Sequence, residues 1–141
     1  MIYTHLTNEA MKIAYEAHHG QVDKGGIPYV FHPFHLAEQM TDEYTTCVAL
    51  LHDVVEDTDV TLEQLAAIFP KEVVDAIALM THAPDVDYYE YVAALKENPI
   101  ARAVKLADLT HNCDRSRLEN PSEKDLWRWE EKYRKAFAIL K

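Results

Sequence analysis

The sequence predicts an all-α fold. Glycine occurs only three times in 141 residues, and the abundance of alanine, leucine and glutamate favours helices over sheets. Apolar residues recur at helical spacing, and capping residues, prolines and glycines stand where helices would begin and end. No segment reads as a strand. With 48% hydrophobic residues the chain can bury one core, so we expect a single domain over residues 1–141.

Two helices are expected in the first forty residues. The first should begin near Thr7, whose hydroxyl can cap it, and end at Gly20. A Gly-Gly pair and a proline rule out a helix in the following loop, residues 21–32. Pro33 then fits the first turn of a short second helix, because its fixed backbone angle is already helical.

The rest of the chain also reads as helices joined by short loops. A third helix is expected over residues 43–57, and Thr61 with Gln64 has the pattern of a capping box that opens a fourth. Later helices are expected from Pro70 to a turn at 83–85, over 88–97, from Pro99 to about Asn112, and over 122–140, where Ser122 and Asp125 resemble a second capping box. The aromatic residues of the last helix could belong to the core or to an oligomer interface, and the oligomeric state stays open: Trp127, Trp129, Tyr133 and Phe137.

The net charge of −10 argues against sequence-independent binding to nucleic acid, which requires a basic surface. It does not exclude a small phosphorylated substrate, because a bound metal ion supplies local positive charge. The N-terminus lacks the features of a signal peptide, and no segment is apolar enough to cross a membrane. Cys47 and Cys113 form neither a CxxC pair nor a disulfide framework, which fits a cytoplasmic protein.

A polar cluster interrupts the apolar third helix. His52 and Glu56 are four residues apart, as are Asp53 and Asp57, so helical spacing places all four side chains on one face. Crowded carboxylates repel one another unless a cation lies between them. The alternative is a solvated, charged helix face.

A second polar cluster lies further along the chain. Helical spacing places Lys105, Asp108 and Asn112 on one face, where Asp108 is either a metal ligand or a buried acid paired with Lys105. Upstream, His32 precedes Pro33 in a rigid stretch that suits a ligand. Together with His52 and Asp53, these residues form a plausible ligand set for a divalent cation, and their chemistry suits manganese, iron, cobalt or zinc.

The chain resembles the HD-domain metal-dependent phosphohydrolases, in particular the RelA/SpoT-type branch that hydrolyses (p)ppGpp, the guanosine 3′,5′-bispyrophosphate alarmone. The resemblance covers residues 10–115. It rests on five strings in the order of the family: Ala17-His-His-Gly-Gln21, Gly26-Ile-Pro-Tyr-Val-Phe-His-Pro33, Leu50-Leu-His-Asp-Val-Val-Glu-Asp-Thr58, Leu79-Met-Thr-His82, and Val104-Lys-Leu-Ala-Asp108 with His111-Asn112.

The resemblance implies an HD-domain helical bundle with one divalent cation, typically Mn²⁺, and hydrolysis of the 3′-pyrophosphate by a water that the metal activates. Glu56 and Asp57 would act on the attacking water. The implied metal ligands are His32, His52, Asp53 and Asp108, and the residues expected to contact the nucleotide are Lys24, Tyr29, Lys105 and Asn112.

Two positions depart from the alarmone-hydrolase pattern. Asp23 stands where the family often has an arginine that packs on the purine, and Leu109 replaces a residue that is often basic. An aspartate cannot make the cation–π contact of an arginine. Two alternatives therefore stand beside alarmone hydrolysis: an HD phosphohydrolase for another nucleotide or phosphorylated metabolite, and an HD module that senses a nucleotide without hydrolysing it.

Overall fold

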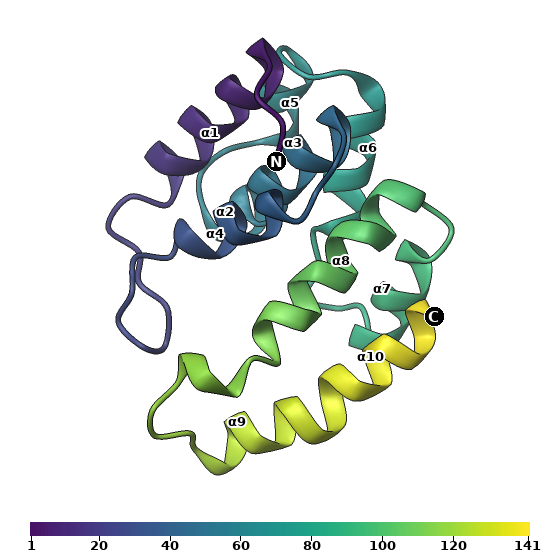
Figure 1. Cartoon of the computed structure of the whole chain (residues 1–141). Helices are drawn as coiled ribbons and strands as arrows, with labels where there is room; N and C mark the ends of the chain where they lie inside the picture. Colours follow the sequence, from purple (N-terminus) through teal and green to yellow (C-terminus); the bar gives the residue numbers. More distant parts are fainter.

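Helices make up nearly all the regular structure of the computed structural model, which describes residues 1–141 (Figure 1). The only β-type pairing is an isolated bridge between Val22 and Pro28, so the predicted all-α fold is confirmed. The α-helices are α1 (His5–Ala17), α2 (Phe31–Glu38), α3 (Glu43–Leu51), α4 (Val54–Asp57), α5 (Leu62–Ala66), α6 (Lys71–Met80), α7 (Tyr88–Leu95), α8 (Pro99–Asn112), α9 (Glu123–Trp127) and α10 (Tyr133–Leu140). A 3₁₀ turn, η1 (Arg115–Arg117), and a π-helical segment, η2 (Arg128–Lys132), complete the chain.

Helix α3 lies at the centre of the packing. All its residues from Thr45 to Leu51 are buried, as expected for a helix that is apolar on every side. It packs against α1, α2, α6 and α8. The C-terminal end of this buried helix leads directly into the polar residues His52 and Asp53. No helix combines the length and the apolar character needed to span a bilayer.

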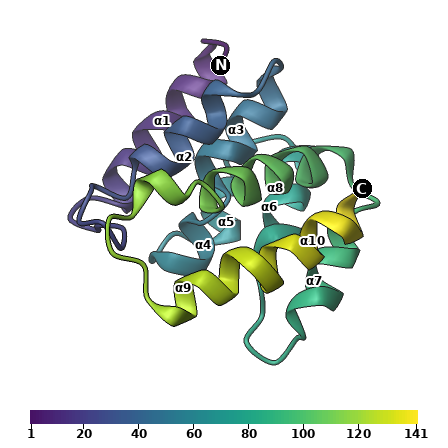
Figure 2. The same cartoon turned by 60° about the horizontal axis from the view of Figure 1, so that its bottom comes forward.

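The last helices form one rod along the edge of the molecule (Figures 1 and 2). Ser122 and Asp125 form the expected capping box at its start, and α10 packs against α7 and α8. The rod is not α-helical throughout, because the N–H of Tyr133 bonds to the carbonyl of Arg128 across a π turn. Of the four aromatic residues on it, Trp127 is exposed and therefore outside the core, whereas the other three are half-buried.

Some predicted helix boundaries are wrong. Thr4, not Thr7, caps α1: its hydroxyl accepts from the N–H of Thr7 at 3.2 Å, and the hydroxyl of Thr7 accepts from the N–H of Thr4 at 2.8 Å. Thr7 is thus the third residue of a capping box whose first residue is Thr4. Helix α2 begins at Phe31, which places His32 in its first turn rather than in the loop, and α7 ends at Leu95 rather than at residue 97.

The continuous helix predicted over residues 43–57 is also wrong. Helix α3 ends at Leu51, the backbone turns at His52 and Asp53, and α4 begins at Val54. The two residues at the turn therefore do not form rows with Glu56 and Asp57 on one uninterrupted helix face. They occupy a junction between two helices instead.

Candidate metal centre and catalytic cleft

The four residues expected to bind a metal ion come together from three segments. His32 lies on α2, His52 and Asp53 at the α3–α4 junction, and Asp108 on α8. Nε2 of His32 lies 2.8 Å from Oδ1 of Asp108, and Nε2 of His52 lies 3.0 Å from Oδ2 of Asp53 and 3.6 Å from Oδ1 of Asp108. Both imidazoles and Asp108 are buried, and Asp53 is half-buried.

His52 has one ring nitrogen satisfied and one without a partner. Its Nδ1 must donate to the carbonyl of Ala49 at 2.7 Å, since a carbonyl oxygen can only accept. Its Nε2 is buried and makes no hydrogen bond, although Oδ2 of Asp53 lies 3.0 Å away. Leaving a buried polar atom unsatisfied is costly. Two imidazoles and two carboxylates around such an atom suit a divalent cation of the first transition row.

The electrostatics of these groups favour added positive charge. Burial would raise the pKa of Asp108, but Lys105 and the two imidazoles hold it well below its usual range. Burial likewise opposes ionisation of Asp53, and the neighbouring His52 lowers its pKa to about 2. Although burial disfavours the charged form of His52, the charges of Asp53 and Asp108 raise its pKa well above the ordinary value. The carboxylates are thus ionised and draw cations toward them.

Lys105 and Asn112, both expected to contact the nucleotide, line the cleft and donate hydrogen bonds to Asp108. Nζ of Lys105 donates to Oδ2 at 2.9 Å, and Nδ2 of Asn112 donates to Oδ1 at 3.2 Å. Lys105 is buried, and its ammonium lies 5.4 Å from the ring centre of Tyr91. The two readings of Asp108 are therefore compatible, because one oxygen pairs with Lys105 while the other faces the histidines.

Tyr29 is likewise held by a carboxylate. Its hydroxyl donates to Oδ2 of Asp53. Burial and the charge of Asp53 raise its pKa, so the phenol stays protonated and keeps donating. The side chain lines both the cleft described next and the cavity beside it.

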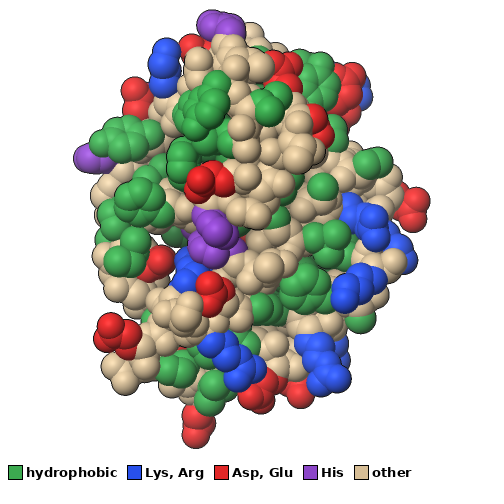
Figure 3. All heavy atoms as spheres, in the orientation of Figure 1, with side chains coloured by type: hydrophobic (Ala, Val, Ile, Leu, Met, Phe, Trp, Pro, Cys, Tyr) green, Lys and Arg blue, Asp and Glu red, His purple; other side chains and the backbone are tan.

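Glu56 and Asp57 border a cleft of about 240 Å³ that is also lined by the four candidate metal ligands. The carboxylates of Asp53, Glu56 and Asp57 lie within 4.8 Å of one another. Oε1 of Glu56 accepts from the N–H of His82 at 2.7 Å, which orients it. Partial burial and the charges of Asp53 and Glu56 raise the pKa of Asp57 to about 6. Acidic, basic and histidine side chains gather near the middle of the face in Figure 3.

Sequence reasoning missed several residues of the site. Nδ1 of His111 lies 2.7 Å from Nδ1 of His32 and supports that imidazole from behind. His82, Tyr88 and Lys132 also line the cleft. His111 and His82 carried a signal, their places in the family strings, while Tyr88 and Lys132 are ordinary side chains that the tertiary fold brings in.

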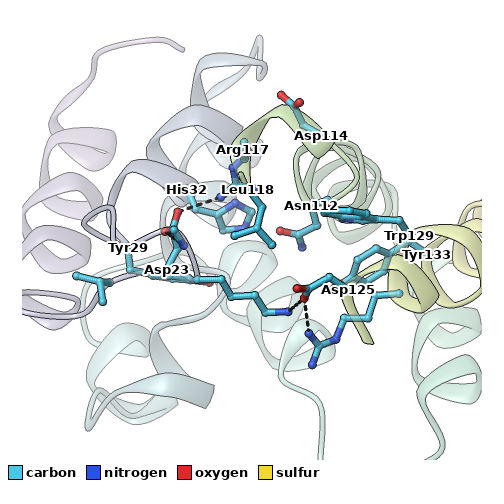
Figure 4. Close-up of a pocket in the computed structure, with 14 residues that line it drawn as sticks. Asp23, Tyr29, His32, Asn112, Asp114, Arg117, Leu118, Asp125, Trp129 and Tyr133 are labelled. Carbon is cyan, nitrogen blue, oxygen red and sulfur yellow. Dashed lines mark hydrogen bonds and ion pairs between the residues drawn. The ribbon is translucent and has the colours of Figure 1, made fainter. Parts of the chain in front are cut away.

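A second cavity of about 330 Å³ adjoins the cleft and shares four lining residues with it: Tyr29, His32, Asn112 and Tyr133 (Figure 4). Lys24 lies here rather than beside Glu56 and Asp57, and its ammonium is held by Asp125 at 2.6 Å. Lys24 therefore lines the adjoining cavity, and its expected contact with the nucleotide stays a prediction.

Asp23 organises the loop beside this cavity. Its Oδ1 accepts from the N–H groups of Gly25 at 2.8 Å and Ile27 at 3.0 Å, and its Oδ2 lies 3.5 Å from Nη2 of Arg117 (Figure 4). Arg117 also donates to the carbonyl of His111 at 2.9 Å. A guanidinium thus reaches this cavity from η1, held in place by Asp23.

Comparison with known proteins agrees with this geometry. SpoT of Escherichia coli K12, named a bifunctional (p)ppGpp synthase/hydrolase, is 31% identical over 134 residues, which cover 79% of this chain and 19% of that protein. A protein of Aquifex aeolicus named guanosine-3′,5′-bis(diphosphate) 3′-pyrophosphohydrolase is 33% identical over 141 residues, covering 92% of this chain and 19% of that protein. The chain thus spans about a fifth of the length of these curated relatives.

The fold has a close counterpart among solved structures. A metazoan ortholog of SpoT, described as hydrolysing ppGpp, superposes with a TM-score of 0.82 and 25% identity over 100% of this chain and 88% of that one. The family model for the HD domain, a domain that implies dependence on a divalent metal, matches residues 10–135. The chain therefore belongs to the HD-domain family.

Proposed function

We propose that the protein is a metal-dependent phosphohydrolase that removes the 3′-pyrophosphate from (p)ppGpp-like alarmones. The observation that carries this proposal is the convergence of His32, His52, Asp53 and Asp108 at the floor of a cleft bordered by Glu56 and Asp57. The names of the SpoT-type relatives support the choice of substrate. We further propose that residues 1–141 act as one domain in the cytoplasm, which the two free cysteines suit.

In this proposal the four converging side chains hold one divalent cation, with Mn²⁺ as the first candidate. When bound, the cation supplies a Lewis acid that offsets negative charge on the reacting phosphate. His111 keeps the imidazole of His32 in place, and Lys105 and Asn112 fix Asp108. Hydrogen bonds of this kind orient ligand side chains and tune their basicity.

Glu56 and Asp57 are the proposed groups that handle the attacking water. Asp57 can take a proton near neutral pH, because its pKa of about 6 lies closer to the working pH than that of an ordinary carboxyl. The N–H of His82 fixes the carboxylate of Glu56, which can then orient the water. The two neighbouring carboxylates would thus share the work of orienting and deprotonating the nucleophile.

The adjoining cavity is the proposed place for the nucleoside. It meets the cleft at Tyr29 and Asn112, so a bound nucleotide could place its phosphates in the cleft and its base beside Arg117 and Trp129. Asp23 favours a second candidate function, hydrolysis of a different nucleotide, because an aspartate that is paired with Arg117 stands where an alarmone hydrolase often has an arginine.

The proposal is tested by incubating the manganese-loaded protein with a panel of nucleotides that includes guanosine tetraphosphate. We expect pyrophosphate release from the alarmone. The variants Glu56→Ala and Asp57→Asn should lower kcat by roughly 10²–10⁴-fold while nucleotide affinity is kept. Glu63→Ala, an exposed change on α5, serves as the control and should behave as wild type.

Each other outcome has a distinct meaning. Faster turnover of another nucleotide would favour the second candidate substrate. Tight nucleotide binding without any turnover would indicate a sensing module instead of an enzyme. No release from any nucleotide, with bound metal confirmed by elemental analysis, would refute the phosphohydrolase proposal.

A further inference from the structure

Lys132 is a cation of the cleft that has no acidic partner. It lies on the π-helical segment η2 and lines the same cleft as Glu56 and Asp57. The other lysine of the cleft, Lys105, is paired with Asp108 at 2.9 Å. Lys132 makes no ion pair or hydrogen bond through its ammonium group, although four carboxylates line the same cleft: Asp53, Glu56, Asp57 and Asp108.

The surroundings of Lys132 make this unpaired charge costly. The side chain is half-buried, and burial together with the positive charges of Arg128 and Lys105 lowers its pKa. Its nearest stabilising neighbour is the ring of Tyr88, whose centre lies 4.3 Å from Nζ. A cation–π contact of this kind also restrains where the ammonium can point.

The backbone that carries Lys132 is itself unusual. The N–H of Tyr133 donates to the carbonyl of Arg128, five positions earlier. In an α-helix the corresponding hydrogen bond reaches back four positions. Single π turns within α-helices are rare and are frequent at functional sites. Lys132 and Tyr133, at the end of this turn, both line the cleft.

We propose that Lys132 binds a phosphate group of the substrate in the catalytic cleft. A lysine without a partner at the edge of a cleft that already holds a candidate metal centre presents three N–H donors to an incoming anion. This inference rests on the proposed function for the identity of the substrate. The anion-binding role of Lys132 depends only on the cleft.

The test compares Lys132→Met with Lys132→Arg and with Lys124→Met, an exposed lysine on the same rod. Calorimetry measures the affinity of the manganese-loaded protein for inorganic pyrophosphate, and steady-state kinetics measures KM for guanosine tetraphosphate. Lys132→Met should weaken pyrophosphate binding and raise KM by roughly tenfold or more, the loss expected for one charged hydrogen bond. Lys132→Arg, which keeps the positive charge, should retain most of the affinity for pyrophosphate. Lys124→Met should match wild type.

A purely structural role would look different. If Lys132 only packed on Tyr88, Lys132→Met would lower the melting temperature and leave pyrophosphate affinity and KM within about twofold of wild type, which would overturn the inference. Lys132→Gln, which keeps most of the stem, replaces Lys132→Met if the latter fails to fold. Lys132-dependent pyrophosphate binding without alarmone turnover would uphold the inference and count against the proposed function alone.

Discussion

Asp108 is the residue through which the parts of the candidate metal centre are connected. Its Oδ1 lies 2.8 Å from His32 and 3.6 Å from His52, and its Oδ2 accepts from Lys105. The carboxylate is buried, so its charge depends on these partners. Lys105 stays charged, because the charge of Asp108 raises its pKa despite burial.

Removing Lys105 should therefore destabilise the protein. Lys105→Met leaves the buried charge of Asp108 without its cation, and breaking a buried pair in this way costs about 3–5 kcal/mol. Urea denaturation of the metal-free protein at pH 7 measures the free energy of unfolding. The double variant Lys105→Met with Asp108→Asn should recover much of the loss, because the orphaned charge is gone. A loss below about 1 kcal/mol in the single variant would mean that Asp108 is solvated or neutral.

The candidate ligands could be recognised from the sequence because each one is polar within an apolar stretch. His52 and Asp53 follow four apolar residues, and Asp108 follows Leu106 and Ala107. Lys132 could not be recognised, since it lies in a charged, exposed-looking stretch and enters the cleft only through tertiary packing. The contact of Lys24 with Asp125, 101 residues apart, was equally beyond local patterns.

At the scale of elements, the break between α3 and α4 shapes the site. His52 is the C-cap of α3 and Asp53 the N-cap of α4, and their side chains lie 3.0 Å apart while Glu56 and Asp57 border the cleft. No glycine or proline marks this break, and the sequence reads as one helix. Tertiary contacts override local propensity here. At Pro99, whose fixed backbone angle suits the first helical turn, the sequence predicted the start of α8 correctly.

The N-terminal cap of α3 offers a test at this scale. Oδ1 of Asp42 accepts from the N–H of Thr45 at 2.8 Å, which satisfies a free donor of the first turn. Asp42→Ala should lower the free energy of unfolding by about 1 kcal/mol, whereas Asp42→Asn should keep nearly all of it, because asparagine caps as well as aspartate. Chemical denaturation measures both. Equal losses in the two variants would assign the effect to the charge of Asp42 rather than to capping.

At the scale of the whole molecule, the candidate centre links segments that are distant in the chain. His32, the His52–Asp53 junction and Asp108 come from helices that pack against α3 or continue directly from it. The rod of α9 to α10, from the far end of the sequence, borders the cleft through Lys132 and Tyr133. The composition and the helix signals of the sequence predicted the all-α class, but they do not encode which helices lie side by side.

Because a cation at this centre would join three segments, its removal should destabilise the entire fold. An ion that binds only the folded state at a free concentration 100 times its Kd adds about 2.7 kcal/mol, which corresponds to roughly 8 °C in melting temperature for a chain of this size. Calorimetric melting of the manganese-loaded protein before and after chelation measures the shift. His52→Ala should abolish most of it, whereas His5→Ala, an exposed histidine at the start of α1, should retain it. An equal shift in wild type and His52→Ala would place the stabilising ion elsewhere and refute the assignment of His52 as a ligand.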